Sequence, residues 1–161
     1  MVKSLLTTAG KVFIILSIIA ITASNYGFRL TMDEQEWLTW SNKCLSESYD
    51  PSVDVKLKKW EIEVTPDHFL RLRKTYQHER QEYFSMNLQK FDGLDYHHST
   101  GLTDTLQIKT NADDIIVQTY NDPKGDLDSM ATVLDIPVKN MAPERLDSLR
   151  NALLFFKSKG L

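Results

Sequence analysis

The chain has 161 residues, of which 42% are hydrophobic and 25% are charged, and its formal net charge at pH 7 is -3. This length suits one hydrophobic core and is short for two domains. The negative charge argues against nucleic acid as a partner, because such binders carry an excess of Lys and Arg. Its single cysteine, Cys44, allows no internal disulfide, so the core must provide the stability.

The N-terminal segment contains an apolar run from Val12 to Ala23, preceded by Lys3 and Lys11. Its length fits the apolar region of a signal peptide, roughly 7 to 15 residues, better than a membrane-spanning helix of roughly 20. Cleavage after Ala23 would leave the bulky Ile21 where a small residue is preferred, so an uncleaved anchor is the alternative. The anchor side chains would be Val12, Phe13, Ile14, Ile15, Leu16, Ile18, Ile19 and Ile21.

The two lysines predict the side of the membrane, because basic residues flanking an apolar run stay in the cytoplasm. We therefore expect the rest of the chain to be exported across, or anchored in, the cytoplasmic membrane, on its extracytoplasmic side. The expected division is a signal peptide or anchor over residues 1–24, a short tether over 25–31 and a single globular domain over 32–161.

The first element expected in that domain is a helix from Met32 to Glu47. Thr31 and Glu34 have the spacing of a capping box, in which each side chain binds the other residue's backbone N–H. Both tryptophans of this segment recur at helical spacing with Cys44, and such a stripe is typical of a face turned to the core. An aromatic belt at membrane-headgroup depth is the alternative.

An alternating pattern of apolar and polar residues then predicts strands. Val53, Val55 and Leu57 share one face, and the alternation changes phase at Lys58–Lys59, which predicts a bulge or a tight turn. Residues 66–78 fit either a helix or a strand. The strand is favoured because residues 83–88 mirror the alternation, as in a hairpin.

Further strands are expected over residues 104–109, 114–120 and about 130–138. Asp122 to Gly125 matches a type I turn, with Asp at the first position, Pro at the second and Gly at the fourth. A helix opened by Pro143 should end the domain. Its apolar stripe consists of Leu146, Leu149, Leu153 and Phe156.

These elements predict an α+β fold: one antiparallel meander of about six or seven strands, packed with an N-terminal and a C-terminal amphipathic helix. A bent sheet closed by the last helix resembles a pleckstrin-homology domain in architecture over roughly residues 53–158, without signature residues. A flatter sheet carrying both helices on one face is the alternative.

Few residues suggest chemistry. Asp95, His97 and His98 form the densest group of potential metal ligands and would serve a metal-dependent hydrolase. However, adjacent histidines diverge and no zinc-site spacing is present, so a solvated loop is favoured. We find no phosphate-binding glycine loop, nucleophile elbow or redox cysteine pair. The expectation is therefore a protein that is not an enzyme and has no cofactor.

The predicted function is a non-enzymatic interaction module of the cell envelope. An exposed strand edge, or the groove between helix and sheet, would bind a protein or peptide partner. The alternative is a carrier for a small apolar ligand or a lipid, which needs an apolar cavity. The aromatic residues expected to line that cavity are Trp60, Phe84, Tyr120 and Phe156.

Overall fold

The computed structural model describes residues 32–101 and 103–159. The expected leader over 1–24, with its anchor side chains, and the expected tether over 25–31 lie outside the described residues. The described residues from Trp37 onward belong to one compact unit. Over the described ranges, no helix is both long enough and apolar enough to span a bilayer.

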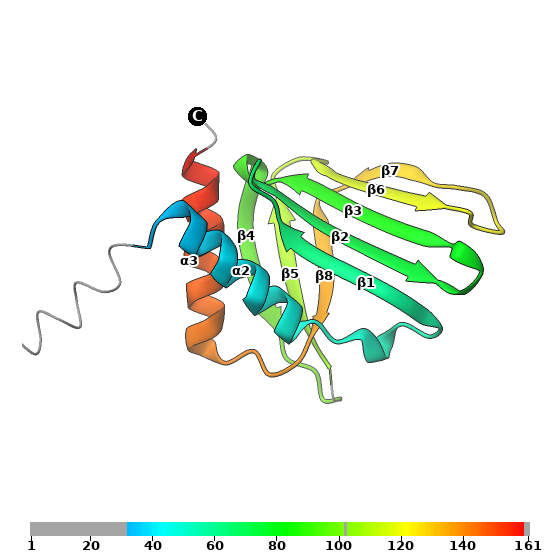
Figure 1. The fold of residues 1–161 in the computed structure, drawn as a ribbon, viewed down its shortest axis with the longest axis horizontal. Helices are drawn as coiled ribbons and strands as arrows, with labels where there is room; N and C mark the ends of the chain where they lie inside the picture. Colours follow the sequence, from blue (N-terminus) through cyan, green and yellow to red (C-terminus); the bar gives the residue numbers. More distant parts are fainter. Residues whose placement is uncertain (1–31, 102, 160–161) are drawn as a thin grey trace, which may run out of the picture. The chain divides into compact units, whose positions relative to one another are not determined.

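The fold is α+β, with two antiparallel sheets between helices α2 (Glu34–Ser48) and α3 (Pro143–Lys159) in the chain. The strand order in the five-stranded sheet is β1 (Leu57–Val64), β2 (Phe69–Tyr76), β3 (Gln81–Asn87), β6 (Ile115–Tyr120) and β7 (Asp128–Ala131). The three-stranded sheet has the order β4 (Phe91–His97), β5 (Asp104–Thr110) and β8 (Val133–Val138). Short 3-10 turns occupy η1 (Pro51–Val53), η2 (Gln77–Glu79) and η3 (Leu88–Lys90). Figure 1 shows α3 alongside β4 and the three-stranded sheet at a steep angle to the five-stranded one.

The predicted single meander is wrong, because the chain changes sheet three times. After β3 it enters the second sheet, after β5 it returns to pair β6 with β3, and after β7 it leaves again to pair β8 with β5. Only Thr132 separates β7 from β8, so the single strand expected over 130–138 is divided between the two sheets. The pleckstrin-homology-like arrangement requires one continuous meander, so the observed order of the strands in two sheets does not match it.

Helix α2 begins with a capping box two residues later than expected. The Glu36 N–H donates to Asp33 Oδ1 at 2.8 Å, and the Asp33 N–H donates to Glu36 Oε2 at 2.9 Å. Thr31 lies outside the described residues. Asp33 and Glu36 have the same spacing as Thr31 and Glu34, and either pair can bind the unpaired N–H groups of a first helical turn. The sequence pattern therefore fits both starting points.

The expected irregularity in β1 is confirmed, since the register shifts between Leu57 and Lys59. The strand begins later than expected, however: Val53 ends η1, and both Val53 and Val55 are exposed, at 46% and 79%. The Asp50 side chain caps η1 by accepting a hydrogen bond from the Ser52 N–H at 3.1 Å. This cap and Pro51 favour a tight turn over an extended chain.

Residues 66–78 contain strand β2, and its hairpin with β3 is confirmed. The turn at Asp122 is confirmed as well, because the Gly125 N–H donates to the Asp122 carbonyl at 2.9 Å. Gly125 has a φ of 104°, which a residue with a side chain rarely adopts.

The hydrophobic core is made of side chains from both sheets and both helices. Its fully buried members include Leu70, Leu72, Leu106, Ile108, Ile136, Leu149, Leu153 and Phe156. Half-buried Trp37 and Trp40 pack against this core. Their two rings meet edge to face with the centroids 6.1 Å apart, and Cys44 of the same helix is buried. The aromatic stripe of α2 is therefore part of the core.

Candidate binding face on the five-stranded sheet

The two faces of β2 carry different side chains because successive residues of a strand point to opposite sides. Leu70, Leu72, Lys74 and Tyr76 are buried on the inner face. Phe69, Arg71, Arg73 and Thr75 alternate with them on the outer face and are half-buried or exposed. The outer face therefore presents aromatic and cationic side chains to solvent.

Strand register aligns the outer side chains in rows across the sheet. In one row, Arg73 lies opposite Glu61 of β1 and Tyr83 of β3, and Tyr83 lies opposite Gln118 of β6. The next row consists of Lys59, Thr75, Gln81 and Tyr120. Arg73 is thus placed near the middle of the face.

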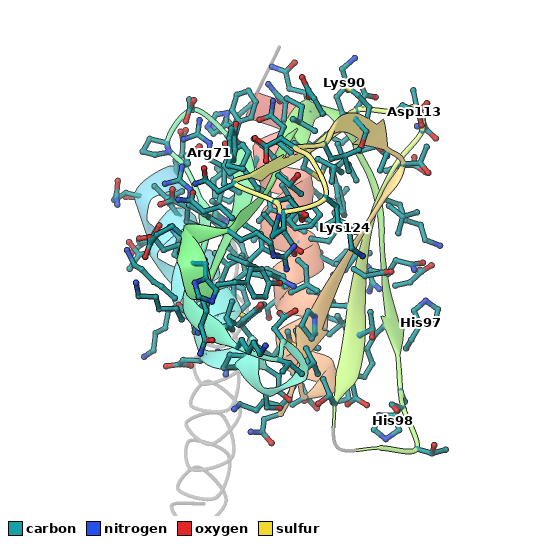
Figure 2. The ribbon with its side chains drawn as sticks, turned by 90° about the vertical axis from the view of Figure 1, so that its right-hand side faces the viewer. Arg71, Lys90, His97, His98, Asp113 and Lys124 are labelled. Atoms are coloured by element: carbon teal, nitrogen blue, oxygen red, sulfur yellow. The ribbon has the colours of Figure 1, made fainter. Side chains whose placement is uncertain are left out.

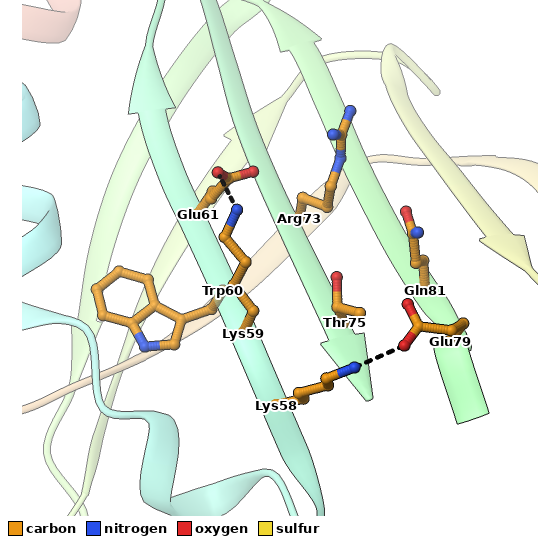
Figure 3. Close-up of a pocket in the computed structure, with 8 residues that line it drawn as sticks. All are labelled: Lys58, Lys59, Trp60, Glu61, Arg73, Thr75, Glu79 and Gln81. Carbon is orange, nitrogen blue, oxygen red and sulfur yellow. Dashed lines mark hydrogen bonds and ion pairs between the residues drawn. The ribbon is translucent and has the colours of Figure 1, made fainter. Parts of the chain in front are cut away.

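Two adjoining hollows cover these rows. One, of about 440 Å³, is lined by Arg73, Gln81, Tyr83 and Tyr120. The other, of about 280 Å³, is lined by Lys58, Lys59, Trp60, Glu61, Arg73, Thr75, Glu79 and Gln81. Figure 3 shows the second hollow, with the Trp60 side chain extending away from Arg73. Because Arg73 and Gln81 line both hollows, we call the two together the sheet-face trough.

The charges in the trough are paired with one exception. Lys59 Nζ lies 2.8 Å from Glu61 Oε1, and Lys58 Nζ lies 2.6 Å from Glu79 Oε1. Each glutamate accepts a hydrogen bond from its lysine. This hydrogen bond, and to a smaller extent the charge of the lysine, lowers the pKa of the glutamate. Arg73 forms no ion pair with any described residue; its guanidinium lies 5.5 Å from the ring centroid of Tyr83.

Apolar side chains adjoin the trough on its β6 and β7 side. Tyr120 is 45% exposed and Met130 is 53% exposed, and half-buried Ile116 lies opposite Met130 in the register. The Tyr120 hydroxyl donates a hydrogen bond to Gln118 Oε1 at 2.9 Å. Tyr, Met and Arg are the residues enriched in protein interfaces, so this face has the composition of a binding surface.

A second polar group, which we call the inner cluster, lies on the opposite side of the same sheet. It consists of Tyr49, Asp54, Lys74, Tyr76 and Glu82. Lys74 Nζ lies 2.8 Å from Asp54 Oδ2, and the Tyr49 hydroxyl donates to the same carboxylate at 3.1 Å. The Tyr76 hydroxyl lies 3.1 Å from Asp54 Oδ1 and 2.9 Å from Glu82 Oε2.

Burial and pairing have opposite effects on the pKa of Asp54 and the same effect on the pKa of the two tyrosines. Burial by itself raises the pKa of Asp54, but the hydrogen bond and charge of Lys74, with both tyrosine hydroxyls, outweigh it, and the pKa is lowered. Burial and the nearby carboxylates raise the pKa of Tyr76 and of Tyr49 well above the usual range. Each member has a partner within the cluster, so none of these polar groups is left without a hydrogen bond or an ion pair.

The four aromatic residues expected to line a carrier cavity do not converge. Trp60 stacks on Tyr49 with the ring centroids 4.5 Å apart, and Phe84 is half-buried on the inner face. Tyr120 lies on the outer face, because its register partner is Gln81 whereas that of Phe84 is Val117. Phe156 is fully buried in α3.

The three potential metal ligands are also separate. His97 is the last residue of β4 and lies 3.4 Å from Gln107 Oε1, whereas Asp95 pairs with Lys109 at 2.5 Å. His98 belongs to the following loop, with its Nδ1 3.0 Å from Asp104 Oδ1. Figure 2 shows the two imidazoles well apart. Nowhere in the described part of the chain do three His, Cys, Asp or Glu side chains form a group that could hold a metal ion.

Sequence reasoning missed Gln81 and Tyr83 as members of a site. The alternation in β2 does place Arg73 on the polar face, which is the one signal available. Their proximity depends on the β2–β3 and β3–β6 registers, and Tyr120 is far from them in sequence. We compared the chain with protein-family models, curated proteins and solved structures, and none of them matches it.

Proposed function

We propose that this chain is a non-enzymatic interaction module of the cell envelope, and that its sheet-face trough binds a protein or peptide partner. The observation that carries the proposal is the group formed by exposed Arg73 and Tyr120 and half-buried Tyr83 around two adjoining hollows. Arginine and tyrosine dominate the energetics of protein interfaces, because each buries a large area while keeping a polar end.

The trough suits an extended peptide in its dimensions. Neighbouring strands lie about 4.8 Å apart, so the path from β1 to β6 measures roughly 14 Å. An extended chain rises about 3.3 Å per residue, so about four residues would cover it. Side chains on one face of that peptide would enter the hollows.

Binding at a free strand edge, one of the two modes expected from sequence, is less well supported at β1 and β4 than binding in the trough. At the end of β1, Asn42 Nδ2 donates to the Val64 carbonyl at 2.9 Å, and the Val64 N–H donates to Asn42 Oδ1 at 2.6 Å. At β4, Arg150 Nη2 donates to the Leu94 carbonyl at 3.0 Å. Side chains thus occupy backbone groups that an added strand would need.

The location proposed for the module follows from the run Val12 to Ala23, as an exported or membrane-anchored domain on the extracytoplasmic side. Expression of the full chain with a C-terminal tag, cell fractionation and mass measurement test this. A shortened soluble envelope protein or a full-length membrane protein supports export or anchoring respectively. Full-length protein in the soluble cytosol contradicts both.

Selection of peptides tests the binding function. The full chain, purified in detergent micelles, is used to select binders from a displayed library of random heptapeptides. We expect enriched peptides that lose binding to Tyr120→Ala and retain it with Leu154→Ala. Leu154 is a matched control, because it is also 45% exposed but lies on α3. The proposal is wrong if no peptide is enriched, or if every enriched peptide binds Tyr120→Ala as well as the parent chain.

A further inference from the structure

We infer that the partner segment is acidic, and that Arg73 pairs with a carboxylate of that segment. This inference rests on the proposed function and specifies its ligand. It starts from the charge balance: three cations and two carboxylates line the hollow shown in Figure 3. Both carboxylates are in contact with lysines, so the hollow has one positive charge in excess. Lys59 lowers the pKa of Glu61 most, and Arg73 lowers it further through its charge but forms no ion pair with it.

The surroundings of Arg73 keep its guanidinium available at the sheet face. Glu61 lies directly opposite in the register, but its carboxylate is held by Lys59 at 2.8 Å. On the other side, the Tyr83 ring lies 5.5 Å from the guanidinium carbon and supports it by a cation–π contact. A planar guanidinium restrained in this way matches a carboxylate through two parallel hydrogen bonds.

The same region offers complementary contacts for the rest of a peptide. Gln81 lines both hollows and has an amide that both donates and accepts hydrogen bonds. The hollow beside Tyr83 and Tyr120 has room for an apolar side chain. Arg73 on β2 and Tyr120 on β6 are two strand spacings apart across the sheet, about 10 Å, and one row apart along it, about 7 Å. The separation is therefore about 12 Å, or about three to four residues of extended peptide. The motif expected is an Asp or Glu with an apolar residue about three or four positions away.

A membrane surface is a poorer fit than an acidic peptide. Anionic lipid attracts broad clusters of basic residues, each contributing additively. Here the other cations of the outer face are neutralised nearby, Lys58 by Glu79, Lys59 by Glu61 and Arg71 by Asp67 at 3.5 Å. One guanidinium without an ion-pair partner, placed against the Tyr83 ring, favours a single, positioned carboxylate.

The test uses the peptides selected above as synthetic fluorescein-labelled probes, each paired with a version in which Asp or Glu is replaced by Asn or Gln. Binding to the full chain in micelles is measured by fluorescence anisotropy for the parent, Arg73→Gln, Arg73→Lys and Lys124→Gln. Lys124 is the matched control, because it is an exposed cation in the turn after β6. Circular dichroism confirms that each variant is folded.

We expect the acid-to-amide change to weaken binding to the parent chain about tenfold, which corresponds to a charge-assisted hydrogen bond of about 1.4 kcal/mol. The same change should have little effect on Arg73→Gln, because the two groups interact directly. Arg73→Lys should be intermediate, and Lys124→Gln should match the parent.

Different results would contradict carboxylate recognition by Arg73 and peptide binding by the trough. Peptides that require Tyr120 but contain no acidic residue, or bind Arg73→Gln as well as the parent chain, overturn carboxylate recognition and leave the proposed function standing. An absence of Tyr120-dependent peptides contradicts the proposed function itself. Binding of dioctanoyl phosphatidylglycerol that Arg73→Gln abolishes, with no acidic peptide selected, overturns the peptide in favour of an anionic lipid.

Discussion

Arg73 and Lys74 are neighbours on β2 that face opposite sides of the sheet and have opposite electrostatic environments. Lys74 is 8% exposed and its ammonium lies 2.8 Å from the Asp54 carboxylate. Arg73 is exposed and has no ion-pair partner among the described residues. A buried cation must be paired because it has lost its hydration, whereas an exposed cation remains solvated. Removing one partner of the inner pair should therefore destabilise the fold, whereas the outer cation is already solvated.

The largest effect should come from breaking the inner pair. Asp54→Asn leaves Lys74 charged with no carboxylate in contact, and both side chains of the pair are largely buried, at 11% and 18% exposed. We expect the free energy of unfolding to fall by about 3 kcal/mol. Urea denaturation of the parent and the variant measures it.

A second substitution provides the control for Asp54→Asn. The double variant Asp54→Asn, Lys74→Met removes the uncompensated charge and should recover part of the lost stability. If Asp54→Asn costs under about 1 kcal/mol, in the range of an exposed ion pair, the contrast between the two faces is lost.

Acid should weaken the same region. Pairing lowers the pKa of Asp54 below the ordinary value of 3.8, so the folded state binds its proton less readily than the unfolded state does. The stability contributed by this carboxylate is present above pH 3.8 and is lost as the pH falls below it, through the folded pKa. Asp50, Asp104 and Asp122 share this direction.

Urea denaturation at a series of pH values from 7 to 3 measures this loss. The free energy of unfolding should fall at the acid end, and it should fall less in Asp54→Asn, which has no carboxylate to titrate at that position. Equal acid sensitivity of the two proteins would show that the inner cluster is not the source.

The next effect concerns the edge of the sheet rather than its faces. Asn42→Ala removes both side-chain hydrogen bonds to Val64 and leaves that backbone N–H and carbonyl without their partner. We expect a loss of about 1–2 kcal/mol in the free energy of unfolding, together with greater self-association. Denaturation and analytical ultracentrifugation measure the two consequences. An unchanged stability would indicate that water replaces Asn42 without cost.

The smallest effect on stability is expected at Arg73. Because its guanidinium is exposed and makes no ion pair within the described chain, Arg73→Gln should change the free energy of unfolding by no more than about 0.5 kcal/mol. The thermal midpoint, compared with that of Lys124→Gln, checks this. A marked destabilisation would mean that Arg73 has a structural role, like Lys74.

Local patterns predicted those elements whose partners are close in sequence. The β2–β3 hairpin, the irregularity of β1 and the turn at Asp122 each depend on residues that are adjacent or a few positions apart. Helix α3 begins at Pro143 as expected and buries most of its predicted stripe. At the start of α2, two overlapping capping-box patterns are present, and the helix begins two residues later than predicted.

Pairing between distant strands could not be predicted in the same way. Any strand with alternating residues can pair with any other, and turn residues indicate where a chain bends rather than which sheet it joins. The β3–β6 and β5–β8 pairs close long segments, and their choice depends on how Leu88, Leu106 and Ile136 fill one core. The meander was wrong for this reason.

The candidate site illustrates the same division. The alternation of β2 alone places Arg73 on the polar face and Leu72 on the apolar face, because the strand period is two. Whether Lys74 is paired, and whether Arg73 is not, depends on Asp54 and Glu61, which reach them only through the loop before β1 and the β1–β2 register. Element types and faces thus follow from short-range periodicity in the sequence. The two sheets, the trough and the one unpaired cation within it follow from long-range packing, which assembles residues that no local pattern connects.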